Sequence, residues 1–261
     1  MLIGHFLVIL RHEMSKSAEQ IAYEKQHLAL LRKMRRACVA YDLIADGDKV
    51  LIGLSGGKDS LALVELLGQQ AQIWVPHFEV IAAHVSISNI GYQSDIQYLE
   101  SFCAKWKVPF IHQTTHYEEL PPNHRNKNHC FLCSWYRRKA LFDTALKMGC
   151  NKIALGHHRD DILETLLMNM VFEGNISTMP PSLSLDTMPL RLIRPLCLID
   201  ERDLETYAAL SHYQQIPKRC PFEHDSMRSR TKKILNTLES LNPHVRDSLW
   251  SAMGNIKEQY L

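Results

Sequence analysis

The sequence predicts an α/β protein with a doubly wound parallel sheet of five strands and additional helices at both ends of the chain. Three observations lead to this fold class. Strand-like and helix-like segments alternate along the chain, which favours parallel strands joined by right-handed crossovers. Residues 49–54 form an apolar run with little alternation, typical of a strand buried on both faces. Polar residues gather directly after the apolar run 151–156, where open α/β sheets bind ligands.

The expected segments follow one another without internal repeats. The helix that opens the series has apolar residues at intervals of three and four, and a turn at residues 46–48 leads from it into the first strand. The predicted helices cover 18–45, 95–107 and 130–148, and the predicted strands cover 49–54, 78–85, 110–114 and 151–156.

Length and composition set the limits of the domain organisation. The 261 residues are ample for a sizeable core, and the formal net charge is only +2. We expect a tail over 1–17, an α/β domain over 18–215 and a C-terminal helical extension over 216–261. Residues 1–10 are too short to cross a bilayer and lack the pattern of a targeting peptide. Without a secretory signature, the seven cysteines indicate a reducing compartment, so we expect a cytoplasmic protein with no membrane segment.

The stretch that organises the chain is a glycine turn that reads SGGKDS between the first strand and a helix. Gly56 and Gly57 let the backbone approach an anion closely, and Ser55 and Ser60 add hydroxyl donors. The helix N-terminus directs free N–H groups and its positive dipole at the same point. The turn therefore predicts a phosphate-binding loop, against the alternative of an ordinary turn before a helix.

The spacing of this loop differs from a Walker A motif, in which Ser or Thr follows the lysine. Here Asp59 follows Lys58, and Gly53 stands one residue too close to Gly57. Lys58 can neutralise phosphate charge, whereas Asp59 suits a phosphate site mainly through a bridging Mg²⁺. The motif resembles the pyrophosphatase-type PP-loop, a resemblance that implies ATP cleavage between the α and β phosphates.

A second candidate site is the pair Cys130 and Cys133, which follows the loop-like segment 118–129 and opens a helix. Both sulfurs then lie on one side of the helix, and the helix dipole favours thiolates. Cys220 is a further cysteine in a polar, loop-like setting. The other cysteines fall in or beside apolar segments and are expected to be small buried residues: Cys38, Cys103, Cys150 and Cys197.

Spacing alone leaves several interpretations of these three cysteines open. A [4Fe–4S] cluster on three thiolates would have one iron free to bind sulfur or substrate. A structural zinc would take a fourth ligand from His129 or His224. A redox pair without metal would leave Cys220 unexplained.

The polar block after strand 151–156 holds the remaining candidates. Asp160 or Asp161 could help to hold Mg²⁺, and the alternative for Asp160 is a helix cap. Gly156 would permit close approach of a nucleotide. The candidate nucleotide-binding residues outside the loop are His84, Gly156 and His157 or His158.

Five motifs, in order and at similar intervals, resemble the tRNA 2-thiocytidine synthetase (TtcA) family: SGGKDS, CFLCSWYRRKALFDTA, IALGHHRDDILETLLMN, LIRPLCLIDERDLETYA and the isolated Cys220. The resemblance covers about residues 30–233. It implies the PP-loop, adenine nucleotide α-hydrolase-like fold and an ATP- and Mg²⁺-dependent enzyme that replaces the C2 oxygen of an anticodon-loop cytidine with sulfur. It also implies a [4Fe–4S] cluster held by Cys130, Cys133 and Cys220.

The resemblance implies roles for individual residues. Lys58 and the loop amides would stabilise departing pyrophosphate, and Asp59 with Asp160 or Asp161 would position Mg²⁺. The expected catalytic residues are Lys58, Asp59, Asp161 and Cys220. The expected partners are tRNA, held by basic residues such as Arg137, Arg138 and Lys232, and a sulfur donor such as a cysteine desulfurase. The C-terminal helices could pack within the subunit or form a homodimer.

One departure from the family pattern leaves two alternative functions open. Many family members have a second Cys-x-x-Cys here, but Glu223 occupies the position three beyond Cys220. The first alternative is a nucleotide- and RNA-binding protein with a structural zinc on the three cysteines and His224. The second is another adenylating enzyme that modifies tRNA, either a ligase or a different thiolase.

Overall fold

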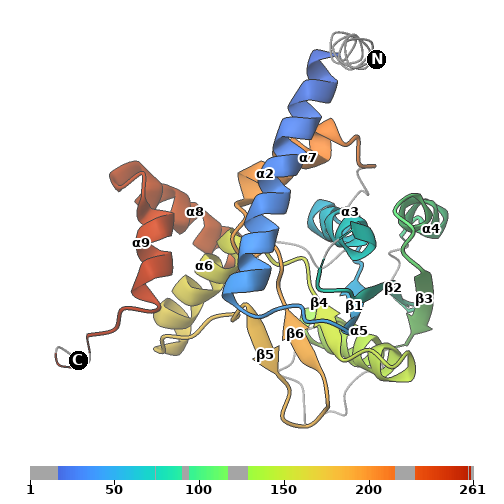
Figure 1. Ribbon diagram of the computed structural model, residues 1–261. Coiled ribbons are helices and arrows are strands. Elements are labelled where there is room, and N and C mark those ends of the chain that lie inside the picture. The colour runs from blue at the N-terminus through green and yellow to red at the C-terminus, as the bar shows by residue number, and fades with distance from the viewer. Residues whose placement is uncertain are drawn as a thin grey trace.

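The computed structural model describes residues 17–257 and 259, apart from 74, 90–93, 117–128 and 215–226. Its centre is a six-stranded sheet in the order β3-β2-β1-β4-β6-β5 (Figure 1). The strands are β1 (Lys49–Gly53), β2 (Glu79–Ile87), β3 (Phe110–Thr115), β4 (Lys152–Ala154), β5 (Ser182–Ser184) and β6 (Arg191–Ile193).

The first five strands of this order pair in parallel, which confirms the predicted parallel sheet. The sixth, β5, pairs antiparallel with β6 at the edge. Five strands were expected and four were located in the sequence; neither β5 nor β6 was located, because each is only three residues long and two residues of β5 are exposed. A strand this short carries almost no periodic signal.

The helices cover both faces of the sheet, as expected for a doubly wound fold (Figure 1). Along β1 the side chains alternate between the faces: Val50 and Ile52 belong to one buried cluster and Leu51 to another. The first cluster packs against α2 (Ala18–Ala40), α3 (Lys58–Ile73), α4 (Ile96–Lys105) and α7 (Glu201–Leu210). The second packs against α5 (His129–Lys147).

Helix boundaries depart from the prediction where a local turn intervenes. The first helix ends at Ala40, five residues before the expected end, because Asp42 adopts a left-handed conformation with φ 49°. Leu43 and Ile44 then return to the core as buried residues. At α4, Asp95 is the N-cap and its side chain accepts a hydrogen bond from the Tyr98 N–H at 3.0 Å.

The last two helices, α8 (Met227–Leu241) and α9 (Val245–Ala252), form a C-terminal lobe that packs on the helix after β4 (Figure 1). In α6 (Arg159–Met168), Leu163 and Leu167 pack against α8 and α9. A π-helical turn, Asn169–Glu173, follows α6. No helix among the described residues is long and apolar enough to cross a membrane.

Candidate active site

The loop between β1 and α3 is held in shape by its own hydroxyl groups. The Ser60 hydroxyl donates to the Gly57 carbonyl at 2.9 Å and accepts from the Gly56 N–H at 3.2 Å. The Ser55 Oγ accepts from the Gly57 N–H at 3.3 Å. Gly56 has φ +88°, a conformation that favours glycine. The predicted phosphate loop is therefore held by its own side chains, and buried Ser60 supports the loop from inside.

Two glycines of the site differ in what surrounds them. A Cβ added to Gly57 would meet only the Ser55 Oγ, at 3.5 Å, so the space in front of Gly57 is open. A Cβ on Gly156 would lie 3.1 Å from backbone atoms of Asp59 and Ser60. Gly156 therefore lets the β4–α6 loop approach the start of α3, and the close approach of a nucleotide at Gly156 stays a prediction.

Lys58 and Asp59 stand at the first turn of α3. The Lys58 Nζ lies 3.1 Å from the Asp59 Oδ1 and 3.6 Å from the Glu201 Oε1. Glu201 begins α7 and was not predicted as a site residue. It lies within the motif LIRPLCLIDERDLETYA, but an acidic residue at a helix start is explained by the helix dipole and does not by itself single out a site.

His158 and Asp161 cap the N-terminus of α6. The Asp161 Oδ2 accepts from the His158 N–H at 3.0 Å, and the His158 Nδ1 accepts from the Asp161 N–H at 3.4 Å. The cap considered for Asp160 is therefore made by its neighbours.

Asp160 is buried and both of its carboxylate oxygens have protein partners. Oδ1 accepts from the Arg246 Nε at 2.7 Å, and Oδ2 accepts from the Glu201 N–H at 2.8 Å. Burial opposes ionisation of Asp160, but these two partners hold its pKa below the usual value. This arrangement gives Asp160 a structural role and does not support the predicted Mg²⁺ ligand.

Asp161 and His157 remain beside the loop with basic neighbours. The Asp161 Oδ1 lies 3.4 Å from an Arg228 nitrogen. The His157 Nδ1 accepts from the Arg194 Nε at 3.3 Å. Burial, reinforced by Arg194 and Arg228, lowers the pKa of His157 to about 4. His157 is therefore a neutral acceptor at neutral pH.

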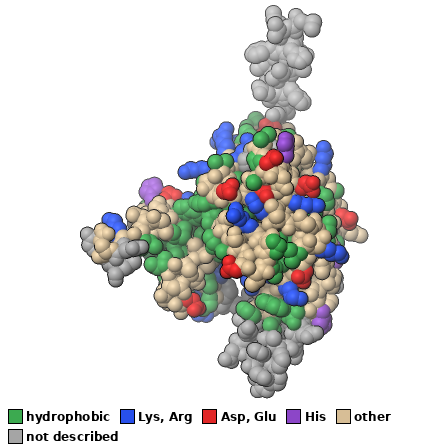
Figure 2. All heavy atoms as spheres, turned by 60° about the horizontal axis from the view of Figure 1, so that its bottom comes forward, with side chains coloured by type: hydrophobic (Ala, Val, Ile, Leu, Met, Phe, Trp, Pro, Cys, Tyr) green, Lys and Arg blue, Asp and Glu red, His purple; other side chains and the backbone are tan. Residues whose placement is uncertain are grey.

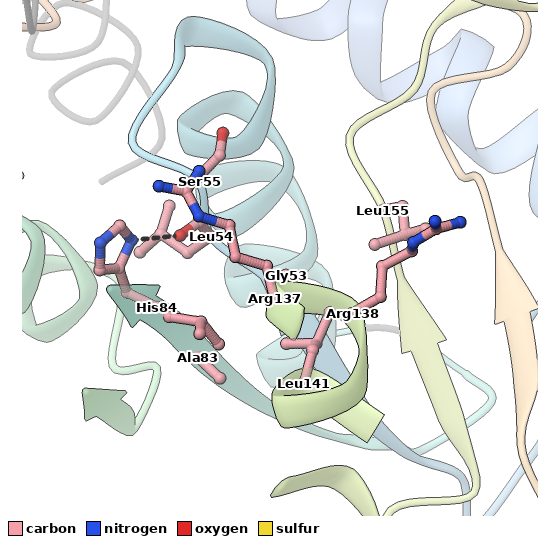
Figure 3. Close-up of a pocket in the computed structure, with 10 residues that line it drawn as sticks. Gly53, Leu54, Ser55, Ala83, His84, Arg137, Arg138, Leu141 and Leu155 are labelled. Carbon is pink, nitrogen blue, oxygen red and sulfur yellow. Dashed lines mark hydrogen bonds between the residues drawn. The ribbon is translucent and has the colours of Figure 1, made fainter. Parts of the chain in front are cut away.

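A pocket opens at the C-terminal ends of β1 and β2, beside Ser55 (Figure 3). The His84 Nδ1 donates to the Leu54 carbonyl at 2.7 Å, and burial lowers the pKa of His84 although this bond opposes the shift. Arg137 and Arg138 enter the pocket from α5, Arg137 toward Ser55 and Arg138 toward Leu155 (Figure 3). The pocket thus combines apolar walls with two guanidinium groups next to the phosphate loop.

The cysteines divide into two groups. Cys133 is half-buried on the first turn of α5, one turn before Arg137, whereas the Cys130 side chain and Cys220 lie outside the described residues. The predicted meeting of the three is therefore untested. The interpretation of the others as buried is confirmed for Cys38, Cys103, Cys150 and Cys197. Burial raises the pKa of Cys38, Cys103 and Cys197 to about 12, so these remain thiols.

Several basic residues have partners within the protein, among them Lys232, which was expected to hold tRNA. Lys33 pairs with Asp203 at 2.6 Å, and the Arg35 Nε donates to the Gln70 side chain at 2.7 Å. Lys232 pairs with Glu201 at 2.5 Å. On the face shown in Figure 2, Lys and Arg side chains are interspersed with Asp and Glu.

The site was then compared with known proteins. Residues 20–216 match the family described as the PP-loop domain (ATP_bind_3). A tRNA-cytidine(32) 2-sulfurtransferase of Sorangium cellulosum is 37% identical over 89% of this chain and 82% of its own length. The protein of the same name from Geobacter sulfurreducens is 34% identical over 93% of this chain and 94% of its own length.

A solved structure agrees with these relatives. The U34-tRNA thiolase NcsA from Methanococcus maripaludis, with its [4Fe-4S] cluster, is 26% identical and superposes with a TM-score of 0.73, covering 90% of this chain and 82% of that chain. The described site and the extent of these matches lead to one conclusion. The chain belongs to the PP-loop proteins and, among them, to the tRNA-cytidine(32) 2-sulfurtransferase (TtcA) family.

Proposed function

We propose that this protein is an ATP-dependent tRNA sulfurtransferase that adenylates and then thiolates C2 of an anticodon-loop cytidine. The observation that carries the proposal is the hydrogen-bonded PP-loop with open space at Gly57, set beside an arginine-lined pocket. The relatives named tRNA-cytidine(32) 2-sulfurtransferase match this chain over about nine tenths of its length. Together they supply the reaction and the substrate class.

ATP would bind with its phosphates over the N-terminus of α3. The free N–H groups there and the Lys58 ammonium stabilise the negative charge that develops on pyrophosphate. Asp59 and Asp161 would hold Mg²⁺, since each lies in the first turn of its helix, α3 or α6, and the loop before α6 contacts the start of α3 at Gly156. Ser55, Gly56 and Gly57 would contact the phosphates, and His84 and His157 would contact the nucleotide as neutral imidazoles.

The reaction has two steps, adenylation of the base and replacement of AMP by sulfur. The C2 oxygen of cytidine attacks the α-phosphorus of ATP, and pyrophosphate leaves. A sulfur nucleophile then attacks C2, and AMP departs with the original oxygen. Arg137 and Arg138 lie where they would neutralise the phosphate of the adenylated base or of the RNA backbone. The target base would be splayed out of its loop to reach the pocket.

The proposed cofactor is a [4Fe–4S] cluster on Cys130, Cys133 and Cys220. The donor set fits it, because three thiolates leave one iron open, and the four other cysteines are buried. When bound, the cluster would present sulfur to the activated base. Cys133 is held one turn from Arg137, which would bring this sulfur chemistry to the pocket.

The remaining expectations are part of the same proposal. A cysteine desulfurase would supply the sulfur, and the enzyme would work in the cytoplasm. A homodimer through the C-terminal helices also stays a prediction. The zinc alternative stays untested in the same way as the cluster, because the Cys130 side chain, Cys220 and His224 lie outside the described residues.

The test is nucleoside analysis of a cytidine-32 tRNA transcript incubated anaerobically with reconstituted protein, ATP, Mg²⁺ and sulfide. We expect 2-thiocytidine from the wild type and none from Cys133→Ala. Cys150→Ala, which changes a buried cysteine just after the C-terminal end of α5, should retain the product. Thiolated uridine in place of cytidine would overturn the assigned base, and a Cys133→Ala protein with full activity would overturn the cluster assignment.

A further inference from the structure

The Glu201 carboxylate lies between two lysines that come from opposite parts of the chain. Its Oε1 is 3.6 Å from the Nζ of Lys58 on α3, and its Oε2 is 2.5 Å from the Nζ of Lys232 on α8. The three side chains are 20%, 29% and 45% exposed, respectively, so solvent screens this contact only in part. The C-terminal helix α8 is thereby connected to the lysine of the phosphate loop.

The backbone of Glu201 is fixed independently of its side chain. Its N–H donates to the Asp160 Oδ2 at 2.8 Å, and Asp160 in turn accepts from Arg246 on α9. Glu201 therefore keeps its place at the start of α7 whether or not Lys58 is engaged with a ligand. A fixed carboxylate of this kind can direct a flexible lysine side chain.

A carboxylate next to a phosphate site creates an electrostatic problem. It attracts Lys58, but it also repels the phosphates that Lys58 is expected to bind. Lys232 is the nearer of the two lysines to Glu201 and forms the shorter ion pair. Burial opposes ionisation of Glu201, but the hydrogen bond and charge of Lys232, with Lys58, hold its pKa below the usual value. Glu201 is therefore ionised and largely neutralised by Lys232.

We propose that Glu201 and Lys232 are positioning residues for Lys58: Glu201 directs the Lys58 ammonium toward the phosphates of ATP, and Lys232 neutralises Glu201 so that it does not repel them. This assigns Lys232 to the nucleotide site through Glu201 and not to the tRNA backbone. The inference rests on the proposed binding of ATP at the PP-loop.

The test is a double-mutant cycle in which the Kd for ATP and the rate of pyrophosphate release are measured with Mg²⁺ and tRNA present. Lys232→Met exposes the uncompensated Glu201 charge, so ATP affinity should fall about tenfold. Glu201→Gln should keep the Kd within about threefold but slow pyrophosphate release about tenfold, because no carboxylate at position 201 then orients the Lys58 ammonium. The double variant should bind ATP within about threefold of the wild type, because it leaves no unpaired charge.

The recovery of affinity in the double variant distinguishes this inference from a structural role, which would make the two losses add. Lys232→Arg should behave like the wild type. Asp203→Asn is the matched control, since Asp203 lies on the same turn of α7 but pairs with Lys33. A Lys232→Met protein that binds ATP normally but tRNA weakly, or a double variant as weak as Lys232→Met, would overturn the inference. Failure of the wild type to bind ATP would instead overturn the proposed function.

Discussion

Gly57 and Gly156 are glycines for different physical reasons, and this difference can be measured. Gly57→Ala adds a methyl group that touches only the Ser55 Oγ at 3.5 Å, so the free energy of unfolding should change by less than about 0.5 kcal/mol. The same methyl group would occupy the space proposed for a phosphate, so ATP binding should be lost. Urea unfolding and nucleotide titration measure the two effects separately.

Gly156→Ala is the counterpart at the same site. Its methyl group would lie 3.1 Å from the backbone of Asp59 and Ser60, which cannot move without shifting the start of α3. The protein should therefore lose about 1–3 kcal/mol of stability. Equal stability of the two variants would show that the β4–α6 loop and the start of α3 can move apart at little cost in free energy.

Glu164 predicts a pH dependence of stability. It is buried on α6, and burial raises its pKa to about 7 although Arg228 lies 3.5 Å away. Burial outweighs this ion pair because the Arg228 side chain is 45% exposed and its charge is screened. Between the ordinary pKa of 4.5 and about 7 the folded state holds the extra proton, so stability falls as pH rises through that window.

Glu164→Gln removes this titration. Relative to the wild type, the variant should gain stability between pH 4 and pH 8, by about 3 kcal/mol at most. Chemical denaturation at several pH values measures the difference. Glu205→Gln, on the exposed face of α7, should follow the wild-type profile. Parallel curves for wild type and Glu164→Gln would show that Arg228 keeps Glu164 ionised.

Individual residues of the site were predictable only where they share a segment. The residues of SGGKDS predict the loop because their roles depend on local backbone geometry. Glu201, Arg194 and Arg246 escaped prediction because their partners lie 37 to 86 positions away in the sequence. The sequence pattern alone does not specify such pairings.

At the scale of the elements, α2, α3 and α7 are joined by a buried carboxylate. Glu65 on α3 accepts hydrogen bonds from the hydroxyls of Tyr23 on α2 at 2.7 Å and Tyr207 on α7 at 2.6 Å. The hydroxyl of Tyr213, just after α7, donates to its other oxygen at 2.7 Å. Because α3 begins with Lys58, this cluster also anchors the helix that carries the phosphate loop.

Glu65→Gln tests the strength of that anchor. The amide nitrogen donates and cannot accept, so at least one tyrosine hydroxyl loses its acceptor in a buried place. The expected cost is about 1–3 kcal/mol, measured by urea unfolding. Glu100→Gln, at an exposed position of α4, should change stability by less than about 0.5 kcal/mol. A similarly small change for Glu65→Gln would mean that the tyrosines find other acceptors.

The same contrast between local and distant information explains which elements were predictable. The strands β1, β2 and β4 lie in clear apolar runs, and β3 begins with Phe110 and Ile111. The helices that follow these strands begin at a polar residue or directly after one. The hairpin of β5 and β6 has three residues in each strand, too few for a periodic pattern. Its strands exist because β6 extends the sheet beside β4.

At the scale of the whole molecule, a buried arginine links the C-terminal lobe of α8 and α9 to the sheet domain. Arg246 on α9 is 8% exposed and binds Asp160 on α6 at 2.7 Å and Glu239 on α8 at 2.5 Å. Asp160 also accepts a hydrogen bond from the Glu201 N–H at the start of α7. The arginine therefore connects the lobe with the element that approaches Lys58.

Arg246→Met tests whether the lobe and the sheet domain are one cooperative unit. The variant leaves the buried Asp160 carboxylate without a cation, at a cost of about 3–5 kcal/mol. If the contact holds the lobe in place, amide hydrogen exchange should accelerate in α8, α9 and the first turn of α7, while β1 and β2 stay protected. Arg202→Met, which removes a 71% exposed partner of the same Glu239, should leave the exchange pattern unchanged. A uniform acceleration that includes β1 and β2 would instead mean that the lobe unfolds only together with the whole molecule. The C-terminal helices and the phosphate loop would then have the same free energy of unfolding.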